Sequence, residues 1–413
     1  MSASLLAASG LLGAAMFSVG GMLPAQAATA APAAPADYAP GFNDVVGVGS
    51  DTLQFIVDFG LDGDVSGDTG YNDAGNLYKA VSFDATADSN ARGAYLNNST
   101  DSSLLPLNPT IVLRGGTYPV QRPNGSGAGI NALLADTAPA DPSINFVRMS
   151  SAPSSANGAT AVTNGWGGLQ EFVLGNENLE MAAADTTNAP NGLSAQQLVA
   201  IYQCTDTKWN QVGGSSTDTI IPVIPQNGSG TRKTFLADLQ TANGGTAITL
   251  GSCVATGEEN DPTGITGQAA TTASPGGPAD AIEPFSGSRL NLWLGKSGNA
   301  TFGSDPGTGY FHDPTVAYPG GAVLTPGVKL LTGAPSDSNA VYDDHYNLWV
   351  VYRWSDQTSS TAWQPGGTLN WAQTLFCDPG GPTPFFQTPA GKTLIAEAGA
   401  NPSTQSCLTT PLT

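Results

Sequence analysis

Three glycine-rich loops each combine a hydroxyl side chain with the start of an amphipathic run. They are Gly47-Val-Gly-Ser-Asp-Thr52, Arg122-Pro-Asn-Gly-Ser-Gly-Ala-Gly129 and Gln226-Asn-Gly-Ser-Gly-Thr-Arg232. After each loop, apolar residues recur at the spacing of three and four that is typical of one helix face. Such a loop can bind an anion, because free N–H groups and the positive end of the helix dipole face the ligand.

Basic residues strengthen the anion interpretation of these loops. A single Ser or Thr after glycine is usually only a helix cap. The chain has just 13 Lys plus Arg against 33 Asp plus Glu, yet Arg122, Arg232 and Lys233 lie inside or beside two of the loops. Arg148 precedes a Ser-Ser turn at the end of an expected strand. Arginine suits a tetrahedral oxyanion, because its planar fork donates two hydrogen bonds at once.

The elements that position these loops have a mixed pattern. Residues 144–149 and 347–353 read as strands, and residues 198–202 and 234–239 read as helices. Ser194 and Gln197 form an expected capping box for the first of these helices. Alternation of this kind predicts an α/β protein.

Five motifs occur in the order found in PstS-type phosphate-binding proteins of ABC transporters, which the sequence resembles over about residues 44–240. They lie at residues 47–52, 125–129, 149–153, 193–209 and 227–231. The resemblance implies a periplasmic-binding-protein-like type II fold. Two α/β lobes would be joined by a hinge of two crossings, with the ligand site between the lobes.

The same resemblance places Asp51, Thr52 and Ser126 against the anion from the first lobe, and Ser229, Gly230 and Thr231 from the second. Neighbours in the same segments complete the expected phosphate site. The full set is Ser50, Asp51, Thr52, Ser126, Gly127, Arg148, Ser151, Ser229, Gly230, Thr231 and Arg232.

Two positions depart from the family pattern. Ser151 stands where the family has an aspartate, and Pro225 stands where it has an arginine, which Arg232 or Arg148 could replace. The aspartate matters because phosphate near neutral pH can donate a proton to a carboxylate, whereas sulfate cannot. We expect Asp51 to take over this acceptor role. The alternative is that Asp51 only caps the following helix.

The chain start predicts export. Residues 1–27 resemble a signal peptide that ends in Ala25-Gln26-Ala27, although no basic residue precedes the apolar run, so that translation could start upstream. A buried N-terminal helix is the alternative. Residues 28–40 form an expected disordered linker. Lobe 1 is expected to comprise residues 41–172 and 350–413, and lobe 2 residues 173–349, with crossings near 172–174 and 347–351.

Cysteine usage agrees with an oxidising compartment. Four cysteines allow three pairings, and we expect the sequence-local one, Cys204 with Cys253 and Cys377 with Cys407. Each such loop is worth about 4 kcal/mol in the chain-entropy model. No cysteine lies near the expected cleavage site, so we expect a secreted or cell-wall-associated protein without a lipid anchor.

The net charge of −20 excludes one class of partner, because an acidic surface repels nucleic acid. With 52 Gly and 30 Pro, the chain is expected to be a loop-rich globular monomer. The expected partners are inorganic phosphate or a similar oxyanion and an ABC transporter permease.

A second candidate site is acidic. Asp62, Asp64, Ser66 and Asp73 occupy positions 1, 3, 5 and 12 of an EF-hand-like loop, which would bind calcium. A solvated acidic insertion is the alternative.

The sequence leaves two other functions as alternatives. A secreted phosphatase lacks its usual signature, since the two histidines, His312 and His345, belong to no catalytic motif. A lobed binding fold with a degenerate ligand site could instead act as a secreted interaction or wall protein, because function belongs to the site rather than to the fold.

Overall fold

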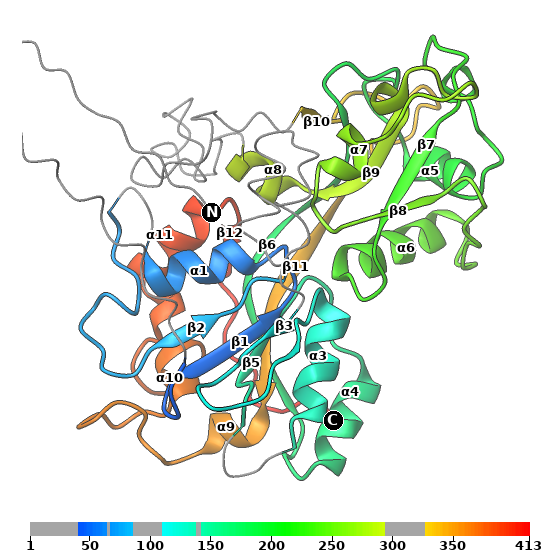
Figure 1. Ribbon diagram of the computed structural model, residues 1–413. Helices are drawn as coiled ribbons and strands as arrows, with labels where there is room; N and C mark the ends of the chain where they lie inside the picture. The colour runs from blue at the N-terminus through cyan, green and yellow to red at the C-terminus, as the bar shows by residue number, and fades with distance from the viewer. Residues whose placement is uncertain (1–39, 64–66, 86–109, 138–141, 294–326) are drawn as a thin grey trace, which may run out of the picture. The chain divides into compact units, whose positions relative to one another are not determined.

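The computed structural model describes residues 40–63, 67–85, 110–137, 142–293 and 327–413 (Figure 1). The expected signal peptide and linker lie outside these residues, apart from Pro40. None of the helices in the described ranges is long and apolar enough to cross a membrane.

One large sheet joins most of the strands. Its order is β2-β1-β5-β11-β6-β9-β7-β8, and β10 and β12 also pair with β6. The strands are β1 (Val45–Gly49), β2 (Ala80–Ser82), β5 (Phe146–Met149), β6 (Leu169–Ala184), β7 (Ile221–Pro225), β8 (Ala255–Gly257), β9 (Ala281–Ser286), β10 (Val328–Leu330), β11 (Asp343–Arg353) and β12 (Asn401–Pro402). A separate pair is formed by β3 (Thr110–Ile111) and β4 (Val120–Gln121).

Two long strands connect two parallel groups. β6 and β11 are antiparallel to each other over most of their length. β11 pairs with β5, β5 pairs in parallel with β1, and β1 pairs in parallel with β2; this group is the first lobe. β6 pairs with β9, β9 pairs in parallel with β7, and β7 pairs in parallel with β8; this group is the second lobe. The two-lobed α/β fold with two crossings is therefore confirmed, whereas the exact residue boundaries of the lobes stay a prediction.

Helices follow the strands in both lobes. With the first lobe lie α1 (Gln54–Asp62), α3 (Ser126–Ala135), α4 (Ser155–Thr163), α9 (Trp354–Thr358), α10 (Trp371–Leu375) and α11 (Pro389–Glu397). With the second lie α5 (Ala195–Tyr202), α6 (Gly230–Ala242), α7 (Thr263–Thr266) and α8 (Gly287–Trp293). Short 3-10 turns are η2 (Trp209–Gln211), η3 (Gly277–Asp280) and η5 (Phe385–Gln387).

The local sequence signals set where several helices start. The capping box of α5 is confirmed, since Ser194 Oγ accepts from Gln197 N at 3.2 Å and Gln197 Oε1 accepts from Ser194 N at 3.0 Å. α1, α3 and α6 each leave one of the three glycine-rich loops, as expected. Asp51 does not cap α1, because the N-cap position is Leu53 and has no side-chain cap bond.

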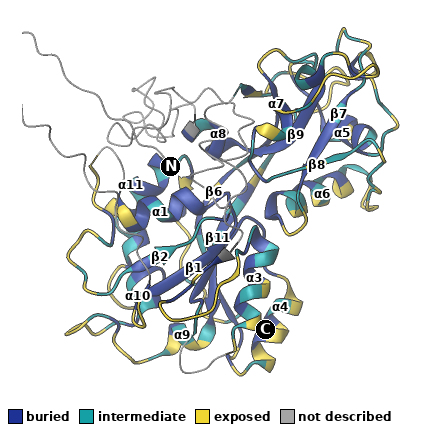
Figure 2. Ribbon diagram, viewed as in Figure 1, coloured by how far each residue is buried: buried dark blue, intermediate teal, exposed yellow. Residues whose placement is uncertain are grey.

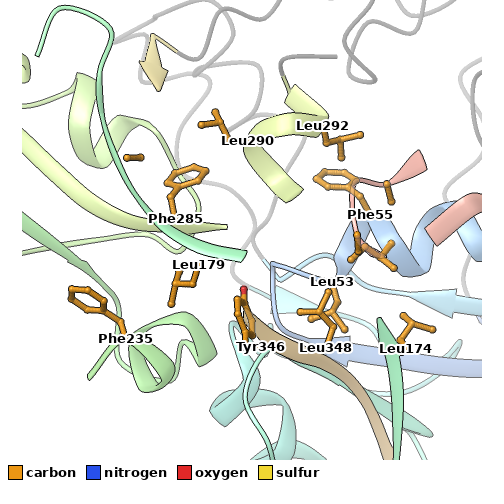
Figure 3. Packing of buried hydrophobic residues seen from close by; sticks show 14 of the residues in the cluster. Leu53, Phe55, Leu174, Leu179, Phe235, Phe285, Leu290, Leu292, Tyr346 and Leu348 are labelled. Atoms are coloured by element: carbon orange, nitrogen blue, oxygen red, sulfur yellow. The ribbon is translucent and has the colours of Figure 1, made fainter. Parts of the chain in front are cut away.

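Apolar packing spans both lobes. The main cluster includes Leu53 before α1, Leu179 of β6, Phe285 of β9 and Leu348 of β11, and Figure 3 shows these side chains gathered from different segments. A smaller cluster under α3 includes Ile130. Figure 2 shows the strands largely buried, with exposed residues on loops and outer helix faces. Burial of these side chains from water is the main force that holds the strands together.

Both expected disulfides are confirmed. Cys204–Cys253 has a Cα–Cα distance of 6.0 Å and joins the residues after α5 to the segment before β8. Cys377–Cys407 has a Cα–Cα distance of 5.6 Å and joins the residues after α10 to the C-terminal segment. Each bond closes a long loop, with sequence separations of 49 and 30 residues.

We expect each paired Cys→Ala replacement to lower the free energy of unfolding by about 4 kcal/mol, because the unfolded chain regains loop entropy. Urea unfolding of C204A/C253A and of C377A/C407A measures this cost. The wild-type protein, denatured without reductant, should show no reactive thiol. A cost under about 1 kcal/mol in both variants would contradict the entropy argument.

Candidate functional site

The third glycine-rich loop forms the N-terminus of α6. Ser229 is the N-cap residue, and its Oγ accepts from the backbone N–H of Arg232 at 3.0 Å. Gly228 has a φ of 93°, a backbone conformation that favours glycine. Ser229 and Thr231 are both buried, with 4% and 0% of their surface exposed. The loop therefore presents buried hydroxyl and N–H donors at the positive end of a helix.

The first lobe contributes a chain of buried hydroxyls. Ser50 follows β1, Ser150 follows β5 and Ser126 begins α3. Ser50 Oγ donates to Ser150 Oγ at 3.0 Å, and the Oγ atoms of Ser126 and Ser150 lie 3.2 Å apart. Since β1 and β5 are parallel, their carboxyl ends bring these side chains to the same edge of the sheet, where α/β proteins bind ligands.

The two lobes meet at this edge. A Cβ on Gly230 would lie 2.2 Å from the Oγ atoms of both Ser126 and Ser150, so only glycine allows this approach. The hydroxyl oxygens of Thr52 and Thr231 are 3.4 Å apart. We call this group the hydroxyl cluster; it comprises Ser50, Thr52, Ser126, Ser150, Ser229 and Thr231. Five of its six members were expected from the sequence, and Ser150 was not.

Gly127 lies beside the cluster and joins the lobes through its backbone. Its N–H donates to the carbonyl oxygen of Gly228 at 2.8 Å. The bond links the second and third glycine-rich loops directly. Gly127 thus helps to hold the two lobes together, and its N–H is already paired within the protein.

Asp51 forms a buried ion pair that the sequence did not reveal. Arg289 Nη1 lies 3.2 Å from Asp51 Oδ2, and both side chains are about 95% buried, with 4% and 5% exposed. Arg289 Nη2 also donates to the backbone carbonyl of Asp51. Asn260 Nδ2 donates to Asp51 Oδ2 at 3.3 Å and to Thr52 Oγ1 at 3.1 Å. The second lobe therefore supplies the partners of the Asp51 carboxylate.

The segment that carries Arg289 is itself held by a buried carboxylate. Glu177 accepts from Ser286 Oγ at 2.5 Å, from Ser288 N at 3.1 Å and from the hydroxyl of Tyr346. Burial raises the pKa of Glu177, and these hydrogen bonds oppose that rise. The network ties the junction of β9 and α8 to both crossings, which fixes the backbone next to Arg289.

Arg148 bonds mainly to backbone carbonyl groups of the first lobe. Arg148 is fully buried and donates to the carbonyl oxygens of Ser50 at 3.1 Å, Gly49 at 3.4 Å and Phe83 at 2.8 Å. It also contacts Ser82 Oγ. Burial lowers the pKa of Arg148, and nearby carboxylates oppose this. In this arrangement Arg148 supports the backbone of the first loop.

Arg232 and Ser151 line a groove next to the cluster. The groove has a volume of about 670 Å³, and its lining also includes Lys233 but no acidic residue. Arg232 Nη1 donates to Pro225 O at 2.8 Å, and Lys233 Nζ donates to Ala152 O at 2.8 Å. These residues therefore surround the approach to the hydroxyl cluster on one side.

Glu259 is a carboxylate that sequence reasoning did not place at the site. Its Oε1 accepts from Ser229 Oγ at 2.8 Å and from Thr231 N at 3.0 Å. It is 1% exposed, and its Oε2 has no hydrogen-bond partner in the described ranges. Burial raises the pKa of Glu259, and the charge of Asp51 raises it further, whereas the bonds from Thr231 and Ser229 lower it.

Other carboxyl groups surround Glu259. Burial raises the pKa of Glu258 to about 7, and the charges of Asp51, Glu259 and Asp261 add to that rise. Burial also raises the pKa of Glu283 well above its usual value, with the neighbouring carboxylates adding to the effect. Neither carboxyl oxygen of Glu283 has a hydrogen-bond partner among the described residues. This side of the site is accordingly rich in carboxyl groups.

The structure describes only part of the expected calcium site and one of the two histidines. Asp64 and Ser66 lie outside the described residues, and Asp62 Oδ1 accepts from Asn72 Nδ2 at 2.6 Å, so calcium binding stays a prediction. The described ranges contain no group of three or more His, Cys, Asp or Glu side chains placed to hold a metal ion. His312 is outside those ranges, and His345 is an exposed residue 3.7 Å from Asp343 Oδ1.

Residues 85–286, a little under half of the chain, match a family model described as the PBP superfamily domain. This part of the chain is therefore similar to a PBP superfamily domain. This match contains the second and third glycine-rich loops and ends just before α8. A search of curated proteins finds no match to the chain.

Solved structures resemble the whole chain only distantly. One is a substrate-binding protein from Clostridium perfringens assigned to phosphate ABC transport and solved with bound phosphate; it has 13% identity, covers 87% of this chain and 100% of that chain, and has a TM-score of 0.47. An ABC-type phosphate transport receptor from Vibrio cholerae has 15% identity, 87% and 100% coverage and a TM-score of 0.44. PstS from Borrelia burgdorferi has 13% identity, 87% and 99% coverage and a TM-score of 0.37.

A sequence signal could have found one of the residues that were missed, Arg289. Gly287-Ser288-Arg289 repeats the pattern of glycine, hydroxyl residue and base at a helix start, and Arg289 is one of only 13 basic residues. Glu259 carried no such signal, because an acidic residue in a loop is usually solvated. Its position follows only from the fold.

We expect Arg289→Met to destabilise the protein by about 3–5 kcal/mol, because the replacement leaves the Asp51 charge buried without its ion-pair partner. Adding Asp51→Asn should recover most of this loss. Urea unfolding of both single variants and the double variant measures the coupling. Arg232→Met, which removes one hydrogen bond to a carbonyl, should cost only about 1 kcal/mol. Simple additivity of the Asp51 and Arg289 replacements would contradict the buried pair.

We expect the folded protein to lose stability as the pH rises from about 5 to about 8. Glu258 and Glu283 have raised pKa values in the folded state, so the folded chain binds more protons than the unfolded chain over this range. Melting temperatures at several pH values measure the slope. Glu283→Gln, which cannot ionise, should flatten it. A melting temperature that rises over this range in the wild type would show that other groups dominate.

Proposed function

We propose that the protein binds a tetrahedral oxyanion, with inorganic phosphate the first candidate, between its two lobes. The observation that carries the proposal is the approach of the α6 N-terminus to Ser126 and Ser150, in which Gly230 leaves no room for a side chain. Hydroxyl and N–H donors from both lobes converge there. Directed donors of this kind replace the water around an anion and give specificity without a metal.

The hydroxyl cluster is suited to an anion because hydroxyls and backbone N–H groups can all donate. Arg289 is paired with Asp51, which lies between Ser50 and Thr52 in the chain. Selection of phosphate over sulfate requires an acceptor for the phosphate proton. We keep Asp51 as the proposed acceptor, since its carboxylate lies next to Thr52 and shares Asn260 with it.

The proposed role is that of an exported solute-binding protein for an ABC-type uptake system, acting as a monomer with a permease as partner. Support comes from the PBP superfamily domain, from the signal-like N-terminal sequence and from the two disulfides. A binding role without catalysis is consistent with the convergence of donors around a closed site. The proposed location is outside the cytoplasmic membrane, either free or at the cell wall.

One observation favours a second candidate, a secreted interaction protein with a degenerate ligand site. Glu259 already accepts hydrogen bonds from Ser229 and Thr231, two of the donors that the anion would need. Ser151 also lacks the carboxylate of the family pattern. Under this alternative the lobes would stay closed without a ligand.

Calorimetric titration with phosphate, sulfate, arsenate, molybdate and simple sugars distinguishes the two candidates. A ligand at a hundredfold excess over its Kd should stabilise the protein by about 2.7 kcal/mol, which a thermal-shift assay also detects. Binding of phosphate in preference to sulfate supports the first candidate. No heat and no thermal shift with any oxyanion would support the second.

We expect Gly230→Ala to weaken phosphate binding at least about tenfold, because its Cβ would overlap the hydroxyls of Ser126 and Ser150 and prevent closure. Gly115→Ala is the matched control, since its nearest contact would be Pro40 O at 3.8 Å. Calorimetry on both variants measures the effect. Equal phosphate affinity in the two variants would place the ligand elsewhere.

A further inference from the structure

The N-terminus of α6 is already bonded to an anion that belongs to the protein. Ser229 Oγ and Thr231 N both donate to one oxygen of Glu259, at 2.8 Å and 3.0 Å. These are among the donors that the proposed function assigns to the oxyanion. We propose that the Glu259 carboxylate is an intramolecular competitor. It occupies the position expected for the oxyanion and must be displaced before phosphate can bind.

The contacts of Glu259 match those expected of a bound oxyanion. Its Oε1 accepts hydrogen bonds from one hydroxyl and one backbone N–H at the N-terminus of α6, a helix of 13 residues. Negative charge is stabilised at this positive end of the helix dipole. Among the described residues, no basic side chain forms an ion pair with it. The α6 terminus is therefore the main source of favourable interaction for this carboxylate.

The second oxygen of Glu259 makes this arrangement unfavourable for the free energy of the folded state. Oε2 is buried and has no hydrogen-bond partner among the described residues. A buried polar atom without a partner normally destabilises the folded state. A tetrahedral anion has four oxygens and can engage more of the hydroxyl cluster than one carboxylate does. Exchange of Glu259 for such an anion would satisfy donors on both lobes.

The neighbouring residue explains how Glu259 is held in place. Asn260 adopts a φ of 55°, and its side chain donates to Thr52 Oγ1 at 3.1 Å and accepts from Ser286 N at 2.9 Å. Asn260 thus anchors the loop between β8 and α7. The side chain of the adjacent Glu259 contacts the N-terminus of α6. A swing of the Glu259 side chain alone would release the donors and leave the anchor intact.

This role differs from that of Asp51. Asp51 is paired with Arg289, so its charge is balanced and its removal leaves the α6 donors as they are. Removal of the Glu259 carboxylate frees Ser229 and Thr231 directly. The inference rests on the proposed function and specifies the residue that limits affinity at that site.

The test compares Glu259→Gln and Glu259→Ala with a charge-matched control, Asp261→Asn. Asp261 lies two residues away in the same loop, and its Oδ1 accepts from Thr263 N at 2.8 Å, which asparagine can also do. Calorimetry with phosphate and with sulfate measures the Kd of each variant, and circular dichroism confirms that each is folded. Glutamine keeps the shape of the side chain should alanine fail to fold.

We expect Glu259→Ala to bind phosphate and sulfate at least about tenfold more tightly than the wild type, because the competing anion is removed. Glu259→Gln should also bind both anions more tightly, but by a smaller factor, because its amide is neutral yet can still accept from Ser229 and Thr231. Asp261→Asn should change either Kd less than about threefold, since it removes a charge but frees no donor at α6. The inference would also be supported if the Glu259 variants bind phosphate and the wild-type protein shows no binding.

Two results would overturn the inference while leaving the proposed function in place. One is unchanged affinity in the Glu259 variants. The other is weaker phosphate binding with relaxed exclusion of sulfate, which would make Glu259 the proton acceptor. If the wild type and both Glu259 variants bind no oxyanion, the proposed function fails, and the inference fails with it.

Discussion

The approach of Gly230 to the hydroxyls of Ser126 and Ser150 constrains everything around the site. The contact brings two polar loops from different lobes into a buried region. Each hydrogen-bond donor there must therefore find a partner in the protein or in a ligand. Serine and threonine meet this demand well, because a hydroxyl can both donate and accept. The closed edge of the sheet therefore consists mostly of hydroxyls.

Charge at this edge is divided between two carboxylates with different surroundings. Asp51 is neutralised by Arg289, and the segment carrying Arg289 is held by Glu177 and its hydrogen bonds to Ser286. Within the described part of the chain, the donors to the Glu259 carboxylate come from the N-terminus of α6. One carboxylate thus helps to hold the lobes together, whereas the other uses the same donors that an anion would use.

The crossings explain why the lobes act as a pair. β6 and β11 pair with each other and also with a strand of each lobe, so movement of one lobe against the other must bend both strands. The register shifts between Leu348 and Trp349 of β11, opposite which Leu174 of β6 is left out of the pairing, so that β6 carries a bulge near the middle of the two crossings. Bulges bend a strand locally, which makes this a suitable place for a hinge.

Sequence alone determined the features that depend on neighbours in the chain. Glycine-rich helix starts and the Ser194 capping box follow from residue types and short separations, and both disulfides join cysteines that are neighbours in the order of the four along the chain. About two-thirds of the expected site residues lie at the edge of the sheet where the lobes meet. The tertiary structure alone decided which groups face the site. Arg289 reaches Asp51 across 238 residues, and Arg148 turns to the backbone of its own lobe. Such contacts depend on how strands stack and which way each side chain leaves the sheet, and no local pattern encodes that.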